Sequence, residues 1–132
     1  MPHRWLDHTG EMELAIEAAS PREVFAEALG ALGELIGEET AAGEPRIRQV
    51  SVSAPDLPTL LVEWLNELVY LSETEDFLSE RVLEMRLGER SLEARVAGRP
   101  APPQALVKAA TYNRLKLEPE NGAWRANVVL DV

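Results

Sequence analysis

The segment Asp7-His8-Thr9-Gly10-Glu11 places several oxygen and nitrogen donors within five residues, at the entrance to a predicted strand. One interpretation is a corner of the chain that binds a metal ion through these donors. The alternative is a turn in which Asp7 and Thr9 form local hydrogen bonds with the backbone. The spacing alone favours the turn, because such clusters are common in turns.

Asp131 is the second candidate, because only Val132 follows it and the terminal carboxylate would add to its charge. Hard cations such as Ca²⁺ or Mg²⁺ prefer oxygen ligands of this kind. On this residue alone, an exposed acidic tail is the simpler interpretation. The sequence does not show whether Glu11 and Asp131 meet in space, since that depends on the fold.

Catalytic motifs of the common enzyme classes are missing from the sequence. The chain has no cysteine and only two histidines, His3 and His8. It contains no G-x-S-x-G elbow, P-loop or glycine-rich dinucleotide motif. A nucleophilic hydrolase or a nucleotide-dependent enzyme is therefore disfavoured.

The composition describes an acidic globular chain of 132 residues with a formal net charge of −10. Nucleic-acid binding needs clustered cations, so this balance instead favours a basic protein surface or divalent cations as partners. Glu73-Thr74-Glu75-Asp76 is an acidic cluster expected just past a helix, where it is either a solvated loop or a contact for a basic partner. With no long apolar run and no signal-peptide pattern, we expect a soluble cytoplasmic protein without membrane contact.

Two helices are predicted from apolar stripes and capping residues. Ser20 and Glu23 form a capping box around Pro21, and this helix ends at Gly37. Asp56 is the expected N-cap of a second helix of about 15 residues with a wide apolar face.

Alternating apolar residues and turn signals predict the strands. They comprise a strand at 11–18, one at 50–54, a hairpin turning at 88–90, a long strand at 106–117 and a final strand at 124–130, the last two joined by an Asn-Gly turn. Three prolines make 98–104 a loop. The predicted class is α+β, with two helices packed on mostly antiparallel sheet in the order β-α-β-α-β-β-β-β.

Three segments together resemble the archease family. The residues at 6–11, Leu-Asp-His-Thr-Gly-Glu, are similar to the family's opening motif D-H-T-A-D. The helix at 60–71, Leu-Leu-Val-Glu-Trp-Leu-Asn-Glu-Leu-Val-Tyr-Leu, is close to the family motif L-L-V-x-W-L-N-E-L-L-Y-L. The segment 107–112 with the ending 129–132 is similar to K-A-x-T-Y and a terminal I-L-D-[IV].

This resemblance implies a single domain over residues 1–132 that is not itself an enzyme. Members of the family assist an RtcB-type RNA ligase, which joins 3′-phosphate or 2′,3′-cyclic-phosphate ends to 5′-hydroxyl ends, as in tRNA splicing. They promote guanylylation and multiple turnover of the ligase, and they bind a divalent cation, typically calcium. Carried over, the metal ligands are Glu11, Asp131 and Val132. From the negative charge balance we expect no direct nucleic-acid binding, and we expect a monomer or weak oligomer.

The opening motif departs from the family pattern, since Gly10-Glu11 replaces Ala-Asp. The extra methylene of Glu11 shifts its carboxylate, and Gly10 adds backbone freedom that could compensate. Two other hypotheses stay open. One is a metal-dependent hydrolase that uses Glu11 and Asp131, with His8 as the base. The other is an acidic protein-binding module.

Overall fold

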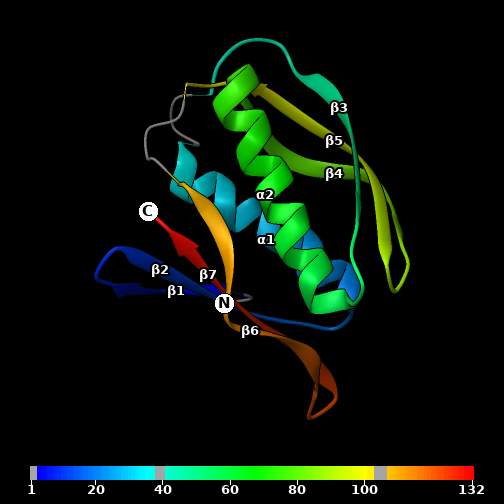
Figure 1. Ribbon diagram of the computed structural model, residues 1–132. Helices are drawn as coiled ribbons and strands as arrows, with labels where there is room; N and C mark the ends of the chain where they lie inside the picture. Colours follow the sequence, from blue (N-terminus) through cyan, green and yellow to red (C-terminus); the bar gives the residue numbers. More distant parts are fainter. Residues whose placement is uncertain (1–2, 38–40, 103–106) are drawn as a thin grey trace.

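The computed structural model describes residues 3–37, 41–102 and 107–132. These residues form two helices and seven strands (Figure 1): β1 (His3–His8), β2 (Glu11–Ala18), α1 (Pro21–Ile36), β3 (Arg46–Ser53), α2 (Leu57–Glu75), β4 (Phe77–Leu87), β5 (Ser91–Pro100), β6 (Ala109–Glu120) and β7 (Ala123–Asp131).

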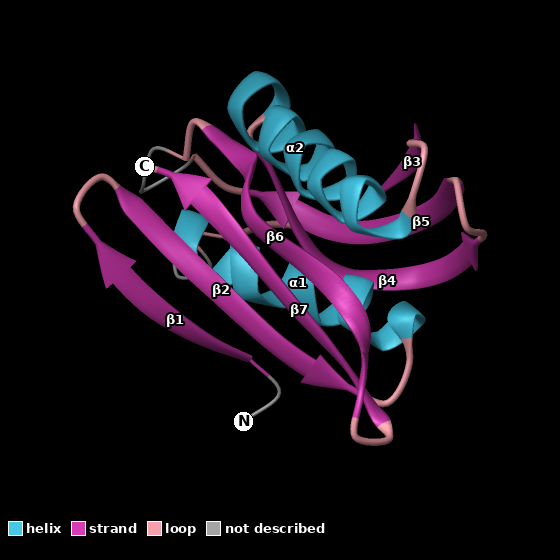
Figure 2. Ribbon diagram, turned by 60° about the horizontal axis from the view of Figure 1, so that its bottom comes forward, coloured by secondary structure: helices cyan, strands magenta, loops and turns pink. Residues whose placement is uncertain are grey.

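The strands make two antiparallel sheets (Figure 2). The first sheet has the order β1-β2-β7-β6 and the second has the order β3-β5-β4. Helix α1 packs on β2 and β4, and α2 packs on β6, β4 and β3, so each helix contacts both sheets. The predicted α+β class with two helices on antiparallel sheet is confirmed, and the structure adds that the strands divide between two sheets.

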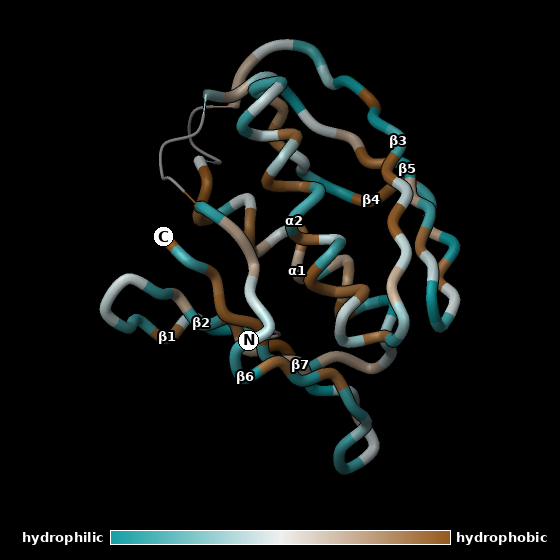
Figure 3. The backbone as a smooth tube through the Cα atoms, viewed as in Figure 1, coloured by the Kyte–Doolittle hydropathy of each residue, from teal (hydrophilic) through white to brown (hydrophobic). Residues whose placement is uncertain are grey.

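Each helix begins at the cap that the sequence predicts. The Ser20 hydroxyl accepts a hydrogen bond from the Glu23 amide at 3.2 Å, and the Asp56 carboxylate accepts one from the Thr59 amide at 2.8 Å. The apolar residues of both helices, which colour parts of them brown in Figure 3, are largely buried. Trp64 is fully buried on α2, and its indole nitrogen donates to the Phe25 carbonyl on α1 at 3.0 Å.

The sequence does not predict β1. Its six residues include only Trp5 and Leu6 as large apolar side chains, and because these are adjacent they produce no alternation. Strand β1 forms by pairing with β2 along its whole length, from His3 opposite Ile16 to His8 opposite Glu11. The observed order is therefore β-β-α-β-α-β-β-β-β.

Several predicted boundaries are wrong, among them the start of β3, which is Arg46 rather than residue 50. Helix α2 has 19 residues rather than about 15, so the acidic cluster occupies its last turn, with Asp76 as its left-handed C-cap. Strand β5 stays paired with β4 up to Pro100, so the proline-rich loop begins later than Gly98. Strand β6 begins at Ala109 rather than at residue 106, which lies outside the described residues, as do 103–105.

His3 fastens β1 to α1. Its Nε2 lies 3.1 Å from a carboxylate oxygen of Glu34, and its Nδ1 hydrogen bonds with Glu27. Burial alone would lower the pKa of His3, but the hydrogen bonds and negative charges of Glu27 and Glu34 outweigh it and raise the pKa. The ring therefore holds its proton more tightly in the folded protein than in the unfolded chain.

This arrangement predicts a pH dependence of stability. A raised pKa contributes stability that is complete below the unfolded value of 6.5 and is lost as the pH rises through the higher folded value. We expect the free energy of unfolding, measured by urea titration, to decline above pH 6.5, and His3→Gln to make that decline shallower. Gln49→Asn is the control, because this position is exposed on the second sheet and has no titratable group, and it should leave the decline unchanged. A decline as steep in His3→Gln as in the wild type would contradict the assignment.

Candidate cation site on the open face of the first sheet

Glu11 and Asp131 are direct partners across neighbouring strands. Strand β2 pairs antiparallel with β7 in a register that places Glu11 opposite Asp131, and the Val132 amide donates to the Gly10 carbonyl at 3.2 Å. Directly opposed residues of an antiparallel pair point to the same face, with Cβ atoms about 4.5–5.5 Å apart. The fold thus brings together two carboxylates that are 120 residues apart in the sequence.

The alternation in both strands decides which face carries these carboxylates. Leu14 on β2 and Leu130 on β7 are fully buried against the helices. Because side chains alternate along a strand, Glu11 and Asp131 lie on the opposite, open face of the sheet. In Figure 2 the four strands of this sheet lie side by side, with α1 behind them.

Arg114 is a third charged residue at this site, and the sequence analysis did not identify it. Its guanidinium lies 3.3 Å from Oε1 of Glu11 and 3.5 Å from Oε1 of Glu13. The residue has a φ of 53° and sits where the β6–β7 register shifts between Thr111 and Lys116. No sequence pattern signals this position, because the shift in register depends on how β6 pairs.

Arg114 has to cross β7 to reach β2, since β7 lies between β6 and β2. Val129 of β7 is opposite Glu13 on one side and Thr111 on the other, on this same open face. Val129 is nevertheless fully buried. The part of this face around Val129 is therefore covered rather than exposed to solvent.

Glu13 completes the charged cluster together with His8. The Nε2 atom of His8 lies 2.9 Å from Oε1 of Glu13. Hydrogen bonds from His8 and Asn127, and the charge of Arg114, lower the pKa of Glu13, so this carboxylate stays ionised near neutral pH. The hydrolase hypothesis assigns His8 as a base beside Glu11 and Asp131, whereas the structure pairs its ring with Glu13.

The predicted motif segments meet in the fold. The Asn66 side chain accepts a hydrogen bond from the Ala110 amide at 2.7 Å and donates to the Ala110 carbonyl at 3.4 Å, so α2 is fixed to the start of β6. The preceding residue, Ala109, is opposite Asp131. The exposed Lys108 precedes the strand, and its amide donates to the Asp131 carbonyl at 2.9 Å. Asn66 therefore supports the start of β6, which pairs with the end of β7 that carries Asp131.

The donors at this site suit an oxygen-preferring cation. The two carboxylates lie on the same face of neighbouring strands, and Val132 can add a main-chain oxygen, while Ca²⁺ takes about six to eight oxygen ligands and would need water for the rest. The positively charged guanidinium of Arg114, 3.3 Å from Glu11, already neutralises part of the negative charge of the two carboxylates. Within residues 3–37, 41–102 and 107–132, no group of three or more His, Asp or Glu side chains is arranged so that it could hold a metal ion. A cation at the Glu11–Asp131 pair would therefore need main-chain oxygens and water to complete its coordination. The corner around Asp7 forms a hairpin turn at Thr9-Gly10.

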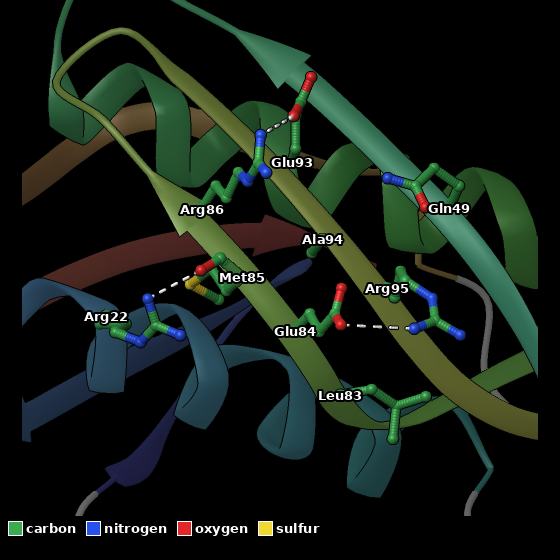
Figure 4. A pocket seen from close by; sticks show the side chains of 9 residues that line it. All are labelled: Arg22, Gln49, Leu83, Glu84, Met85, Arg86, Glu93, Ala94 and Arg95. Atoms are coloured by element: carbon green, nitrogen blue, oxygen red, sulfur yellow. Dashed lines mark hydrogen bonds and ion pairs between the residues drawn. The ribbon is translucent and has the colours of Figure 1, made fainter.

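A separate depression of about 570 Å³ lies over β4, β5 and β3 (Figure 4). Two of its three lining arginines are paired with glutamates: Arg95 lies 3.5 Å from Glu84, and Arg86 lies 4.0 Å from Glu93. The third, Arg22, donates to the Met85 carbonyl at 2.8 Å. In the acidic cluster of α2, Glu75 pairs with Arg48 at 2.8 Å. Neither the depression nor the acidic cluster of α2 includes Glu11 or Asp131.

The chain is thus a small α+β protein in which two helices pack against two antiparallel sheets. One open sheet face carries the pair of acidic residues Glu11 and Asp131. No helix among the described residues is long and apolar enough to cross a membrane. Residues 3–132 match the model of the Archease protein family (MTH1598/TM1083), and this chain belongs to the archease family.

Relatives support this assignment over the whole chain. The chain is 36% identical to Protein archease of Methanosarcina mazei, covering 98% of this chain and 95% of that protein. It is 31% identical to Protein archease of Methanopyrus kandleri, with complete coverage of both.

Solved structures share the fold. The solution structure of protein 1598 of Methanobacterium thermoautotrophicum superimposes with a TM-score of 0.72 at 24% identity, covering 99% of both chains. The crystal structure of an archease and possible chaperone from Thermotoga maritima gives a TM-score of 0.71 at 19% identity, covering 96% of this chain and 94% of that one.

Proposed function

We propose that this protein is a non-catalytic activator of an RtcB-type RNA ligase. In this role it promotes guanylylation of the ligase, so that the ligase completes many rounds of joining 3′-phosphate to 5′-hydroxyl RNA ends. Membership of the archease family supports the helper role. The observation that carries the proposal is the register that sets Glu11 opposite Asp131.

In this proposal, Glu11 and Asp131 hold a divalent cation, with a main-chain oxygen of Val132 as a further ligand. Calcium fits best, because it accepts many oxygen ligands at flexible geometry. The longer Glu11 side chain is compatible with the site, since the direct opposition of the two residues leaves room for one carboxylate to reach toward the other. When bound, the cation supplies a positive charge at the edge of an otherwise acidic surface.

The net charge of −10 supports docking on a basic partner. A ligase that binds RNA needs clustered cations for the phosphates, so its surface is complementary to this one. Such complementarity raises the rate of association and fixes orientation more than it raises affinity.

The direct test uses an RtcB-type ligase from the same source. Guanylylated ligase is quantified with labelled GTP and Mn²⁺, with and without equimolar protein, under conditions that require several turnovers. We expect several-fold more guanylylated ligase with the protein, and an effect that weakens as ionic strength rises.

The control replaces this protein with an equal amount of unrelated acidic protein, which should leave the ligase unchanged. Equal guanylylation with and without the archease-family protein would contradict the proposal.

A further inference from the structure

Arg114 is placed where a bound cation would have to compete with it. Its guanidinium contacts Glu11 at 3.3 Å, which is one of the two carboxylates assigned to the cation. A divalent ion held by Glu11 and Asp131 would lie a few ångströms from this positive charge. Two cations at that separation repel one another, and the repulsion is strongest where the sheet excludes water.

The backbone of Arg114 holds it in this position. The carbonyl of Arg114 accepts a hydrogen bond from the Asn127 side chain at 3.1 Å. A left-handed backbone conformation is unusual for a residue with a side chain, and it persists only when its surroundings determine it. The direction of the side chain toward β2 is therefore set by the fold.

The ion pair can nevertheless open. The Arg114 side chain is 47% exposed, and that of Glu11 is 27% exposed. Ion pairs at such exposure contribute little to stability, so a bound cation can displace the guanidinium. Glu13 is a second partner for Arg114 at 3.5 Å, which gives the guanidinium a carboxylate to keep after it leaves Glu11.

We infer that Arg114 is a built-in competitor for the cation: its guanidinium pairs with Glu11 and has to release that carboxylate before a divalent ion can bind Glu11 and Asp131 together. The inference rests on the proposed cation site. The competition sets the affinity of the site for the cation, because every binding event includes the loss of the Arg114–Glu11 contact. Archease-family proteins with an uncharged residue at this position should bind the cation more tightly.

The test compares calcium binding by Arg114→Gln and Arg125→Gln with the wild type, using isothermal titration calorimetry of the purified protein. Both variants remove one positive charge from the same open face, but Arg125 pairs with Glu17 at 3.0 Å and with Glu120 at 3.4 Å, away from Glu11. We expect Kd to fall about fivefold or more in Arg114→Gln and less than about twofold in Arg125→Gln. Arg114→Lys, which keeps the charge, should stay close to the wild type.

Thermal unfolding provides a second readout. Calcium should raise the melting temperature of Arg114→Gln by more than it raises that of the wild type, because a tighter ligand stabilises more. Equal or weaker calcium binding by Arg114→Gln would overturn the inference and leave the cation site intact. Absence of calcium binding in all the variants and in the wild type would overturn the cation site and the inference together.

Discussion

Asp131→Asn should raise the calcium dissociation constant at least about tenfold while leaving the fold intact. The substitution keeps the shape of the side chain but removes one of the two opposed negative charges at the end of β7. Cation affinity in carboxylate sites follows the number of charged ligands, so this loss is large. The stability cost should be within about 0.5 kcal/mol, since Asp131 is only half-buried and lies at a strand end.

Isothermal titration calorimetry with calcium measures the affinity, and circular dichroism measures the fold. Glu17→Gln is the matched control, because it removes a carboxylate from the same face of β2, six residues from Glu11. The control should bind calcium with a Kd within about twofold of the wild type. The same Asp131 variant should also lose most of the ligase stimulation. Calcium affinity and stimulation at wild-type levels would show that Asp131 has no part in the site.

Gly98→Ala should cost about 3 kcal/mol or more in the free energy of unfolding. A Cβ added at Gly98 would lie 2.1 Å from the Leu78 carbonyl oxygen and 2.7 Å from the Phe77 ring. Because the first of these neighbours is backbone of β4, no side-chain rotation can relieve the clash, and the β4–β5 pairing has to shift. Urea denaturation monitored by tryptophan fluorescence measures the change.

The control is Gly30→Ala in α1, where an added Cβ would have no atom within 4 Å. Alanine is favoured over glycine inside a helix, so this variant should be more stable by about 0.5–1 kcal/mol. We therefore expect Gly98→Ala to lower the free energy of unfolding and Gly30→Ala to raise it. A Gly98→Ala protein as stable as the wild type would show that β4 and β5 do not approach this closely.

The helices and most of the strands were predictable because their signals are local. The capping residues Ser20 and Asp56 and the apolar stripe of α2 need only neighbouring residues to be recognised. Strand β1 was not predictable, because it depends on the β2 edge to which it pairs and on the burial of His3 by two glutamates of α1. The division into two sheets also follows from long-range pairing.

The site was predictable in part. The family resemblance suggested Glu11 and Asp131 as candidate ligands, whereas the residue types alone favoured a turn and an exposed acidic tail, and only the β2–β7 register shows that the two residues are opposite each other. Arg114 could not be found in this way, because its role depends on a register shift in β6 and on a left-handed backbone conformation. The role of Asn66 could not be predicted either, because apolar residues dominate the pattern of its helix and its hydrogen-bond partner is the backbone of Ala110.

The most direct test of the paired-carboxylate site is a crystal soaked in Mn²⁺, with anomalous diffraction recorded at the manganese edge. We expect an anomalous peak between the carboxylates of Glu11 and Asp131, with the Arg114 guanidinium withdrawn from Glu11. A soaked crystal with no anomalous peak at this position, and with Arg114 still paired to Glu11, would contradict it.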